Sequence, residues 1–521
     1  MSISLELTIF NKLFAAVAEE MGIVLRRSAF SPNIKERRDY SCALCTADGE
    51  LLAQAAHIPV HLGALPRTMA RVLPEFPLGP GDVLLLNDPY WGGTHLPDLT
   101  VLAPVYAQER LAFYLVNRAH HADVGGSTPG SMPLARSLEE EGVVIPPTYL
   151  FKAGRFQEDL LSSLIARMRV PAERRGDLQA QMAALHRGQE RVRGLIARYG
   201  LEKLIDMSRA LLAYSERAMG ELIDAIPDGS YAFEDYLDDD GYGHRDLALR
   251  LTLTIAGNRA VLDFRASGGQ AEGGVNAVPP VVDAACYYVF LTLLAEEYPI
   301  NQGCFRPLKV LTRPGSLLDP LYPAPVAAGN VETSQRLVDV VLGALAPALP
   351  EVIPAASQGT MNNLAFGGFC TDTGQEFTYY ETIAGGMGAR PSRPGLDGVH
   401  THMTNTRNTP VEVLEHDYPL LVERYALREN SGGSGRFAGG RGLIRDFHFL
   451  APVSVSLLSD RRVHAPYGLQ GGGPGAAGEN ALLTETGEER LPGKINLPLP
   501  PGSRLSIRTP GGGGWGEDEK N

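Results

Sequence analysis

This chain has few cysteines, no excess of positive charge and no long apolar run. Five cysteines in 521 residues are too few, and odd in number, for a disulfide framework, which favours a reducing compartment. A net charge of −13 argues against broad electrostatic binding to nucleic acid or to an anionic membrane. The most apolar run, 284–295, is too short to span a bilayer. These features predict a soluble, cytoplasmic protein that binds neither nucleic acid nor membrane.

The N-terminal segment resembles a helix more than a targeting signal. Residues 1–30 have Glu6 early and lack both a basic n-region and a small-residue cleavage site. Their apolar side chains recur at steps of three and four residues, which predicts an amphipathic helix: Phe10, Leu13, Phe14, Val17, Met21 and Val24.

Several common functional motifs are also missing. The sequence has neither the G-x-x-x-x-G-K-[ST] of a P-loop nor the G-x-S-x-G of a nucleophile elbow. G-x-G-x-x-G occurs at 473–478 and 511–516, but neither match opens a helix, as a dinucleotide site requires. Cys42 and Cys45 form a lone C-x-x-C in a strand-like run, which predicts two buried thiols rather than a zinc or redox site.

The remaining pattern predicts an α+β (mixed α/β) fold with three regions. Region 1–150 combines a helix with strands at 40–53, 82–86, 100–106 and 111–117 and carries the metal-binding loops described below. Region 151–230 holds two helical stripes separated by Gly200, which predicts a helical hairpin or a kinked pair. Region 231–521 begins with strands at 249–255 and 260–264 and helices at 283–297 and 333–347, and ends in a β-rich, glycine-heavy part. The regions are either domains or parts of one compact unit.

The segment from Asn87 to Met132 concentrates side chains that can carry chemistry. His95, His120 and His121 lie close in sequence to Asp88, Asp98 and Asp123. Imidazole and carboxylate are ligands for Zn, Mn or Fe(II), which need several of them to converge. His95 and Asp98 share a turn opened by Gly92-Gly93, and an antiparallel return of the chain would bring His120 back beside them. Neighbours on an extended segment face opposite sides, so only one of His120 and His121 should be a direct ligand.

Several motifs in the same order resemble one family across nearly the whole chain. They are ERRDYSCAL (36–44), HIPVHLGALP (57–66), DPYWGGTHLPD (88–98), HHADVGGSTPGSM (120–132), VETSQRLVD (331–339), THMTNTRNTPVEVLE (401–415) and SGGSGRFAGGRGL (431–443). The chain is similar in these segments to the hydantoinase B/oxoprolinase family. That family includes B subunits of ATP-dependent hydantoinases, related lactamases, the C-terminal part of 5-oxoprolinases and α subunits of acetone carboxylases.

The resemblance implies a divalent metal, Mn, Zn or Fe, with a defined set of ligands. Its motifs place these ligands on His95, Asp98 and His120, with Asp39 as a further ligand. His121 or Asp123 is then the candidate catalytic group for proton transfer. His57 and His61 are either part of this site or buried, hydrogen-bonded histidines.

The resemblance also implies a division of labour between two subunits. A partner A subunit with an actin/hexokinase-like ATP-binding fold would phosphorylate a small lactam or imide, and this B subunit would then hydrolyse the activated ring. ATP would be used by the partner and not bound by this chain, and the two would form a hetero-oligomer. The alternatives are an α-type subunit of an ATP-dependent carboxylase, which is typically longer, and a non-catalytic scaffold subunit, against which the density of ligand-type residues argues.

Two further segments stay open between two interpretations. The glycine loop 431–442, with Arg436 and Arg441, could bind phosphate through backbone amides, but β-turns with surface arginines are the favoured interpretation. His400 and His402, with Asn405 and Glu412, either line a pocket or brace it.

Overall fold

The N-terminal part is a sheet covered by long helices. The computed structural model describes residues 3–55, 58–294, 298–370 and 374–518. Helix α1 (Leu5–Ser28) is capped by Ser4 and buries the stripe of Phe10, Phe14, Val17 and Met21, which confirms the predicted amphipathic helix. No described helix is long and apolar enough to cross a membrane.

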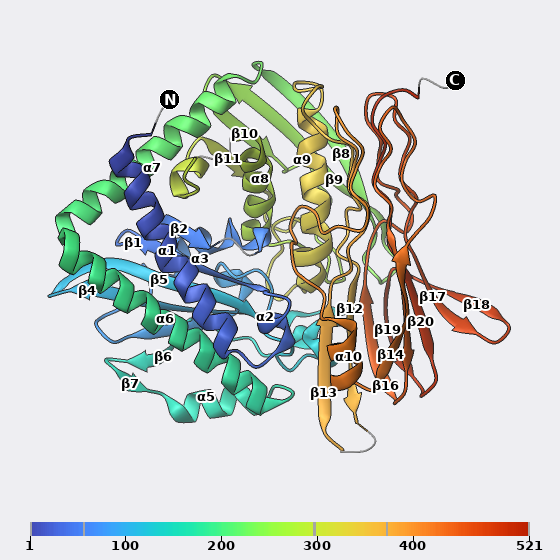
Figure 1. Cartoon of the computed structure of the whole chain (residues 1–521), viewed down its shortest axis with the longest axis horizontal. Helices are drawn as coiled ribbons and strands as arrows, with labels where there is room; N and C mark the ends of the chain where they lie inside the picture. Colours follow the sequence, from blue (N-terminus) through green and yellow to red (C-terminus); the bar gives the residue numbers. More distant parts are fainter. Residues whose placement is uncertain (1–2, 56–57, 295–297, 371–373, 519–521) are drawn as a thin grey trace.

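Seven antiparallel strands form the sheet on which α1 packs (Figure 1). Their order is β2-β1-β5-β4-β3-β6-β7. The strands are β1 (Tyr40–Thr46), β2 (Leu51–Ala55), β3 (Val83–Leu86), β4 (Asp98–Ala107), β5 (Arg110–His120), β6 (Thr148–Lys152) and β7 (Arg155–Phe156). In the β4–β5 pair Asp98 lies opposite His120, which confirms the predicted antiparallel return. Burial raises the pKa of Cys42 strongly and that of Cys45 to about 12, so these two β1 residues are buried thiols as predicted.

Two long helices follow, α6 (Pro171–Tyr199) and α7 (Leu201–Asp224). Gly200 ends α6 in a backbone conformation (φ 81°, ψ 148°) that suits glycine, and its N–H donates to the carbonyl of Ile196. Figure 1 shows the two helices meeting at an angle there, and α6 packs along α1. A kinked pair, and not a helical hairpin, therefore describes this region. The shorter helices of the N-terminal half are α2 (Pro32–Lys35), α3 (Ala64–Val72), α4 (Leu138–Glu141) and α5 (Glu158–Ile165).

The central part is a second sheet with two buried helices. Its strands follow the order β11-β10-β9-β8, with β8 (Gly229–Asp239), β9 (Arg245–Ala256), β10 (Arg259–Asp263) and β11 (Leu308–Leu311). Helices α8 (Pro279–Leu293) and α9 (Ser334–Leu345) pack together, and a π-helical turn, η5 (Gly329–Thr333), leads directly into α9. Both helices were predicted, although residues 295–297 of the first lie outside the described residues.

The C-terminal part consists of two sheets of orders β13-β12-β16-β19 and β14-β15-β20-β17-β18 (Figure 1). The elements are β12 (Asn363–Phe369), β13 (Glu376–Glu381), α10 (Val411–Asp417), β14 (Leu420–Leu427), β15 (Leu443–Phe449), β16 (Val453–Leu458), β17 (Glu479–Thr484), β18 (Gly487–Leu491), β19 (Lys494–Leu499) and β20 (Arg504–Arg508). One apolar core includes side chains from both sides of residues 150 and 230, and a second lies between these two sheets.

The glycine-rich loops form a stack of backbone segments. Gly433 and Gly514 donate to the carbonyls of Gly512 and Gly473, and a Cβ on Gly512 would lie 2.0 Å from the carbonyl oxygen of Met387. Their glycines therefore permit close backbone approach. The Gly433 amide is bonded to a carbonyl and Arg441 pairs with Asp397 and Glu429, so these groups do not support the phosphate-binding interpretation of the loop 431–442, and its residues form stacked backbone segments where β-turns had been the favoured interpretation.

Candidate metal centre

Five imidazole and carboxylate side chains from four segments meet in one buried cavity. They are Asp39, just before β1; His61, at the end of the short helix η1 (Pro59–His61); His95, in the loop that leads into β4, and Asp98, the first residue of β4; and His120, the last residue of β5. All five are at most 8% exposed. The cavity has a volume of about 20 Å³, room for one water molecule or one metal ion. We call it the His/Asp cavity.

Asp98 lies at the centre of this arrangement. Its Oδ2 is 3.2 Å from Nε2 of His61 and 3.3 Å from Nε2 of His95, and it accepts the hydroxyl of Thr94. Its Oδ1 is buried without a hydrogen-bond partner. Burial raises the pKa of Asp98, but the neighbouring imidazoles His95 and His61 lower it further, so the pKa lies well below its usual value. Asp98 is therefore an ionised carboxylate with one oxygen free for a ligand.

His120 is held in place at one nitrogen and unpartnered at the other. Nδ2 of Asn33 lies 3.0 Å from its Nδ1, and the ring stacks on Tyr380 with centroids 4.7 Å apart. With the Asn33 amide rotated by 180°, its oxygen accepts the Nδ1 proton and Nε2 keeps its lone pair, as a metal-binding histidine requires. Nε2 has no partner in the described structure. Burial and the nearby His95 lower the pKa of His120 well below its usual value, so the ring is neutral at pH 7.

His95 faces His120 across the cavity, with ring centroids 5.0 Å apart. Its side chain is fully buried, its Nδ1 has no partner among the described residues, and its Nε2 has only the 3.3 Å contact with Oδ2 of Asp98. A buried polar atom without a partner costs about 1–3 kcal/mol, so such atoms gathered around one cavity point to an additional ligand.

Asp39 and His61 complete the set. Together with Asp98 they offer ligand atoms that all lie within 4.8 Å of one another. His61 is fixed by the Ser41 hydroxyl, 3.0 Å from its Nδ1. Burial raises the pKa of Asp39, against the effect of Arg37; a cation in the cavity would hold this carboxylate ionised. The unpartnered nitrogens and the two carboxylates therefore fit a divalent ion.

The structure does not bring His121 and Asp123 to this cavity. His121 points to the other side of the chain, where its Nε2 is 3.0 Å from Oε1 of Gln181. The carboxylate of Asp123 accepts the backbone N–H groups of Gly125 and Gly130 and lies 3.1 Å from Nη1 of Arg169. These contacts hold a loop together. His57 lies outside the described residues.

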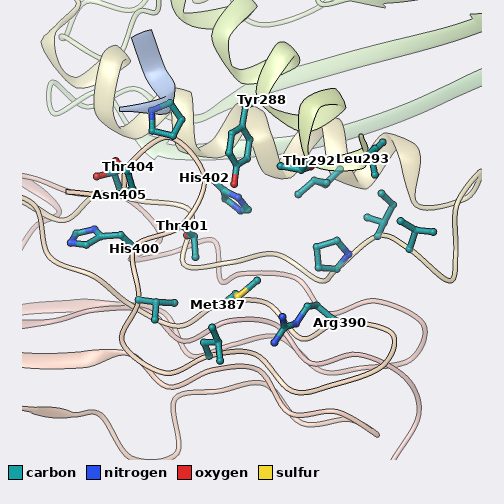
Figure 2. A pocket seen from close by; sticks show the side chains of 17 residues that line it. Tyr288, Thr292, Leu293, Met387, Arg390, His400, Thr401, His402, Thr404 and Asn405 are labelled. Carbon is teal, nitrogen blue, oxygen red and sulfur yellow. The ribbon is translucent and has the colours of Figure 1, made fainter. Parts of the chain in front are cut away.

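A larger cavity of about 760 Å³ shares one lining residue with the first. Figure 2 shows the side chains that line the larger cavity. Thr404 lines both cavities, and Pro59 of the larger one stands between Ile58 and Val60 of the smaller. His400, His402 and Asn405 line the larger cavity, as the first interpretation holds, whereas Glu412 of α10 is not among the residues that line it. We call this cavity the chamber.

Two residues that contact His120 were missed by sequence reasoning. Asn33 lies before β1 and Tyr380 lies on β13, and neither belongs to a pattern that indicates a site. No signal could have found them, because their contacts with His120 exist only after folding.

A family model, curated relatives and a solved structure all resemble this chain over nearly its whole length. The model of the family hydantoinase B/oxoprolinase matches residues 4–518. A 5-oxoprolinase 1 of Arabidopsis thaliana is 42% identical over 98% of this chain, and a protein of Pseudomonas sp. described as a putative D-/L-hydantoinase B subunit is 33% identical over 96%. The chain spans 42% of the length of the first relative and 88% of the second. The crystal structure of an ATP-dependent caprolactamase from Pseudomonas jessenii superposes with a TM-score of 0.92 at 27% identity, covering 99% of this chain and 92% of that one.

Proposed function

The chain belongs to the hydantoinase B/oxoprolinase family, and we propose that it is the metal-dependent hydrolytic B subunit of an ATP-dependent hydantoinase or lactamase. The observation that carries the proposal is the His/Asp cavity, where imidazoles and carboxylates converge with several polar atoms unpartnered. Such a donor set suits a divalent Mn, Zn or Fe ion. In a scaffold subunit without a metal, nothing would offset the cost of burying these unpartnered polar atoms around a space the size of one ion.

The proposed reaction is the opening of an activated cyclic amide or imide. An unstrained amide resists hydrolysis because resonance stabilises it and its nitrogen leaves poorly. A partner subunit would phosphorylate the amide oxygen with ATP. This chain would then consume two molecules of water, break the C–N bond of the ring so that its carbon becomes a carboxylate and its nitrogen the leaving group, and release phosphate. A divalent ion, when bound, supplies the Lewis acidity that makes water reactive near neutral pH.

The side chains of the cavity have distinct tasks in this proposal. Asp39, His95, Asp98 and His120 are the proposed ligands. His61 is either a further ligand or the group that orients Asp98, which it contacts at 3.2 Å. Asn33 and Tyr380 fix the ring of His120. Proton transfer by His121 or Asp123 stays a prediction that their contacts do not support.

An A-type partner is part of the proposal. One relative that this chain matches is more than twice as long, and another carries the name of a subunit. Both facts are consistent with a second polypeptide or domain that handles ATP. The expected assembly is a hetero-oligomer in which the partner binds ATP and this chain binds the metal.

The test begins with elemental analysis of the purified chain beside His120→Ala and Asp98→Ala. We expect about one Mn, Zn or Fe ion per wild-type chain and its loss from both variants, because each removes a ligand from a small site. His186→Ala is the matched control, because this histidine of α6 is 69% exposed, pairs with Glu190 and does not line the cavity. It should keep the metal.

Turnover then tests the chemistry. With an A-type subunit, ATP and a panel of hydantoins and lactams, the wild type should open a ring and His120→Ala should not. ATP binding by the partner should be the same with either chain. Ring opening by a His120→Ala chain that holds no metal would refute the proposal.

A further inference from the structure

The chamber has a mainly apolar wall with polar groups at a few places. Its apolar lining comes from α8, α9 and the loops around 352–354 and 396–399, and includes Leu293, Leu342, Ile353, Leu396 and Val399. Tyr288 and His402 face it from one side, and Met387 and Arg390 from the other (Figure 2). Its volume of about 760 Å³ lies within the range of small-molecule sites, roughly 300–1,000 Å³.

The two cavities differ in what they can hold. The His/Asp cavity, at about 20 Å³, has no room for an organic ring beside an ion. The chamber has that room and shares Thr404 with it. If the His/Asp cavity is the reactive centre, as proposed above, the body of the substrate must lie in the chamber.

Arg390 alone among the described residues that line the chamber carries a permanent charge. Burial lowers the pKa of His400 to about 4, so this ring is neutral at pH 7. His402 is engaged by Asp339, 3.3 Å from its Nε2. Among the described residues that line the chamber, one guanidinium therefore carries a permanent charge at neutral pH.

That guanidinium has no anionic partner among the residues that the structure describes. Its Nη2 donates to the carbonyl of Pro394 at 3.0 Å, and its Nε is buried without a partner. The backbone beneath it is fixed, since the N–H of Arg390 donates to Arg393 and that of Ala389 to Gly513. A fixed arginine with open donors can bind a carboxylate or phosphate through two parallel hydrogen bonds.

We infer that the chamber binds a substrate with an apolar body and one anionic group, and that Arg390 holds the anion. This inference deepens the proposed function and rests on it for the place of the reaction. The anion has two possible sources: a carboxylate carried by the ring, or the phosphate added on activation. Both offer oxygens to the same guanidinium, and the experiment separates them.

The experiment measures binding of three probes to the full chain by calorimetry and ligand-observed NMR. The probes are 5-oxoproline, 2-pyrrolidinone, which is the same ring without the carboxylate, and inorganic phosphate. The wild type should bind at least one anionic probe about 10-fold more tightly than 2-pyrrolidinone, and Arg390→Met and Arg390→Gln should remove that preference. Arg393→Met is the control, because Arg393 is an exposed arginine of the same loop that does not line the chamber.

The outcomes separate the sources and the two hypotheses. Preference for 5-oxoproline indicates a ring carboxylate, and preference for phosphate indicates the activating group. The inference is overturned if the wild type binds all three probes equally. It is also overturned if both Arg390 variants keep the anion preference and the wild-type circular dichroism spectrum. The metal content of the same samples tests the proposed function separately. A chain that holds no metal but keeps its anion preference would refute only the proposed function.

Discussion

Two adjacent histidines, His120 and His121, show how one residue step decides a side chain's role. His120 is the last residue of β5 and His121 follows it, and successive side chains of an extended segment point to opposite faces. The first enters the His/Asp cavity with Nε2 unpartnered, and the second lies 3.0 Å from Gln181 on α6. Burial lowers the pKa of His121 to about 4, so it is a neutral, buried hydrogen-bonding group.

We therefore predict opposite results for the two alanine variants. His121→Ala should keep the metal of the wild type. It should lower the free energy of unfolding by about 1–3 kcal/mol, because Oε1 of the buried Gln181 loses its contact with His121. His120→Ala should lose the metal. Elemental analysis and urea denaturation of the two variants check this, and loss of metal from His121→Ala would show that the side chain acts on the cavity after all.

Part of the site could be predicted from residues alone. The H-x-x-D spacing of His95 and Asp98 and the β4–β5 return are local, and both follow from turn and strand signals. The place of His61 could not be decided, because a buried histidine looks the same in sequence whether it contacts Asp98 or an apolar neighbour. Tyr380 comes from β13, and nothing in a sequence reports a stack between residues so far apart.

At the scale of elements, the wall of the His/Asp cavity includes a π-helical turn. Asn330 and Val331 of η5 line the cavity, and π-turns of this kind are frequent at functional sites. The segment before η5 is fixed by Glu141 of α4, whose Oε1 accepts the N–H groups of Val326 and Ala327 at 2.8 Å each. Glu141 thus helps to position one wall of the cavity.

Glu141 also predicts a pH dependence of stability. Burial raises its pKa from 4.5 to about 8, although the two backbone N–H groups act in the opposite direction. The folded protein therefore keeps a proton that the unfolded chain releases. That contribution is complete below pH 4.5 and is lost as the pH rises through 8.

The variant Glu141→Gln should remove this dependence, since the amide oxygen can still accept both N–H groups and carries no charge at any pH. Since a difference of one pH unit in pKa corresponds to about 1.4 kcal/mol, we expect the free energy of unfolding of the wild type to fall by about 4 kcal/mol more than that of the variant between pH 5 and pH 9. Glu140→Gln, at an exposed neighbour on the same helix, should keep most of the pH dependence, because the charge of Glu140 is the smallest of the causes that shift the pKa of Glu141. Parallel stability curves for wild type and Glu141→Gln would contradict the assignment.

Element types were predictable where periodicity is strong, as for α1, α6 and the β4–β5 pair. The angle between α6 and α7 was not, because Gly200 marks the end of a helix but does not fix the direction of the next one. The angle between the two helices depends on contacts such as the packing of α6 along α1, which joins residues far apart in the chain.

At the scale of the whole molecule, buried charges connect the central part to the C-terminal sheets. Asp460, which follows β16, is paired with Arg336 of α9 and with Lys494 of β19. The side chains of all three are at most 1% exposed. The sequence did not predict that these charged residues form one cluster, because 124 positions separate Arg336 from Asp460.

Removing one partner of this network should destabilise the whole protein. Lys494 Nζ lies 2.8 Å from Oδ2 of Asp460, and Lys494→Met keeps the apolar stem while deleting the charge. The carboxylate then stays buried with one cation fewer, which should cost about 3 kcal/mol. Arg504→Met breaks a surface pair with Glu423 in which the arginine is 51% exposed, and it should change stability by less than about 0.5 kcal/mol. Urea unfolding followed by circular dichroism measures both, and equal midpoints for the two variants would mean that the buried network does not hold the two parts together.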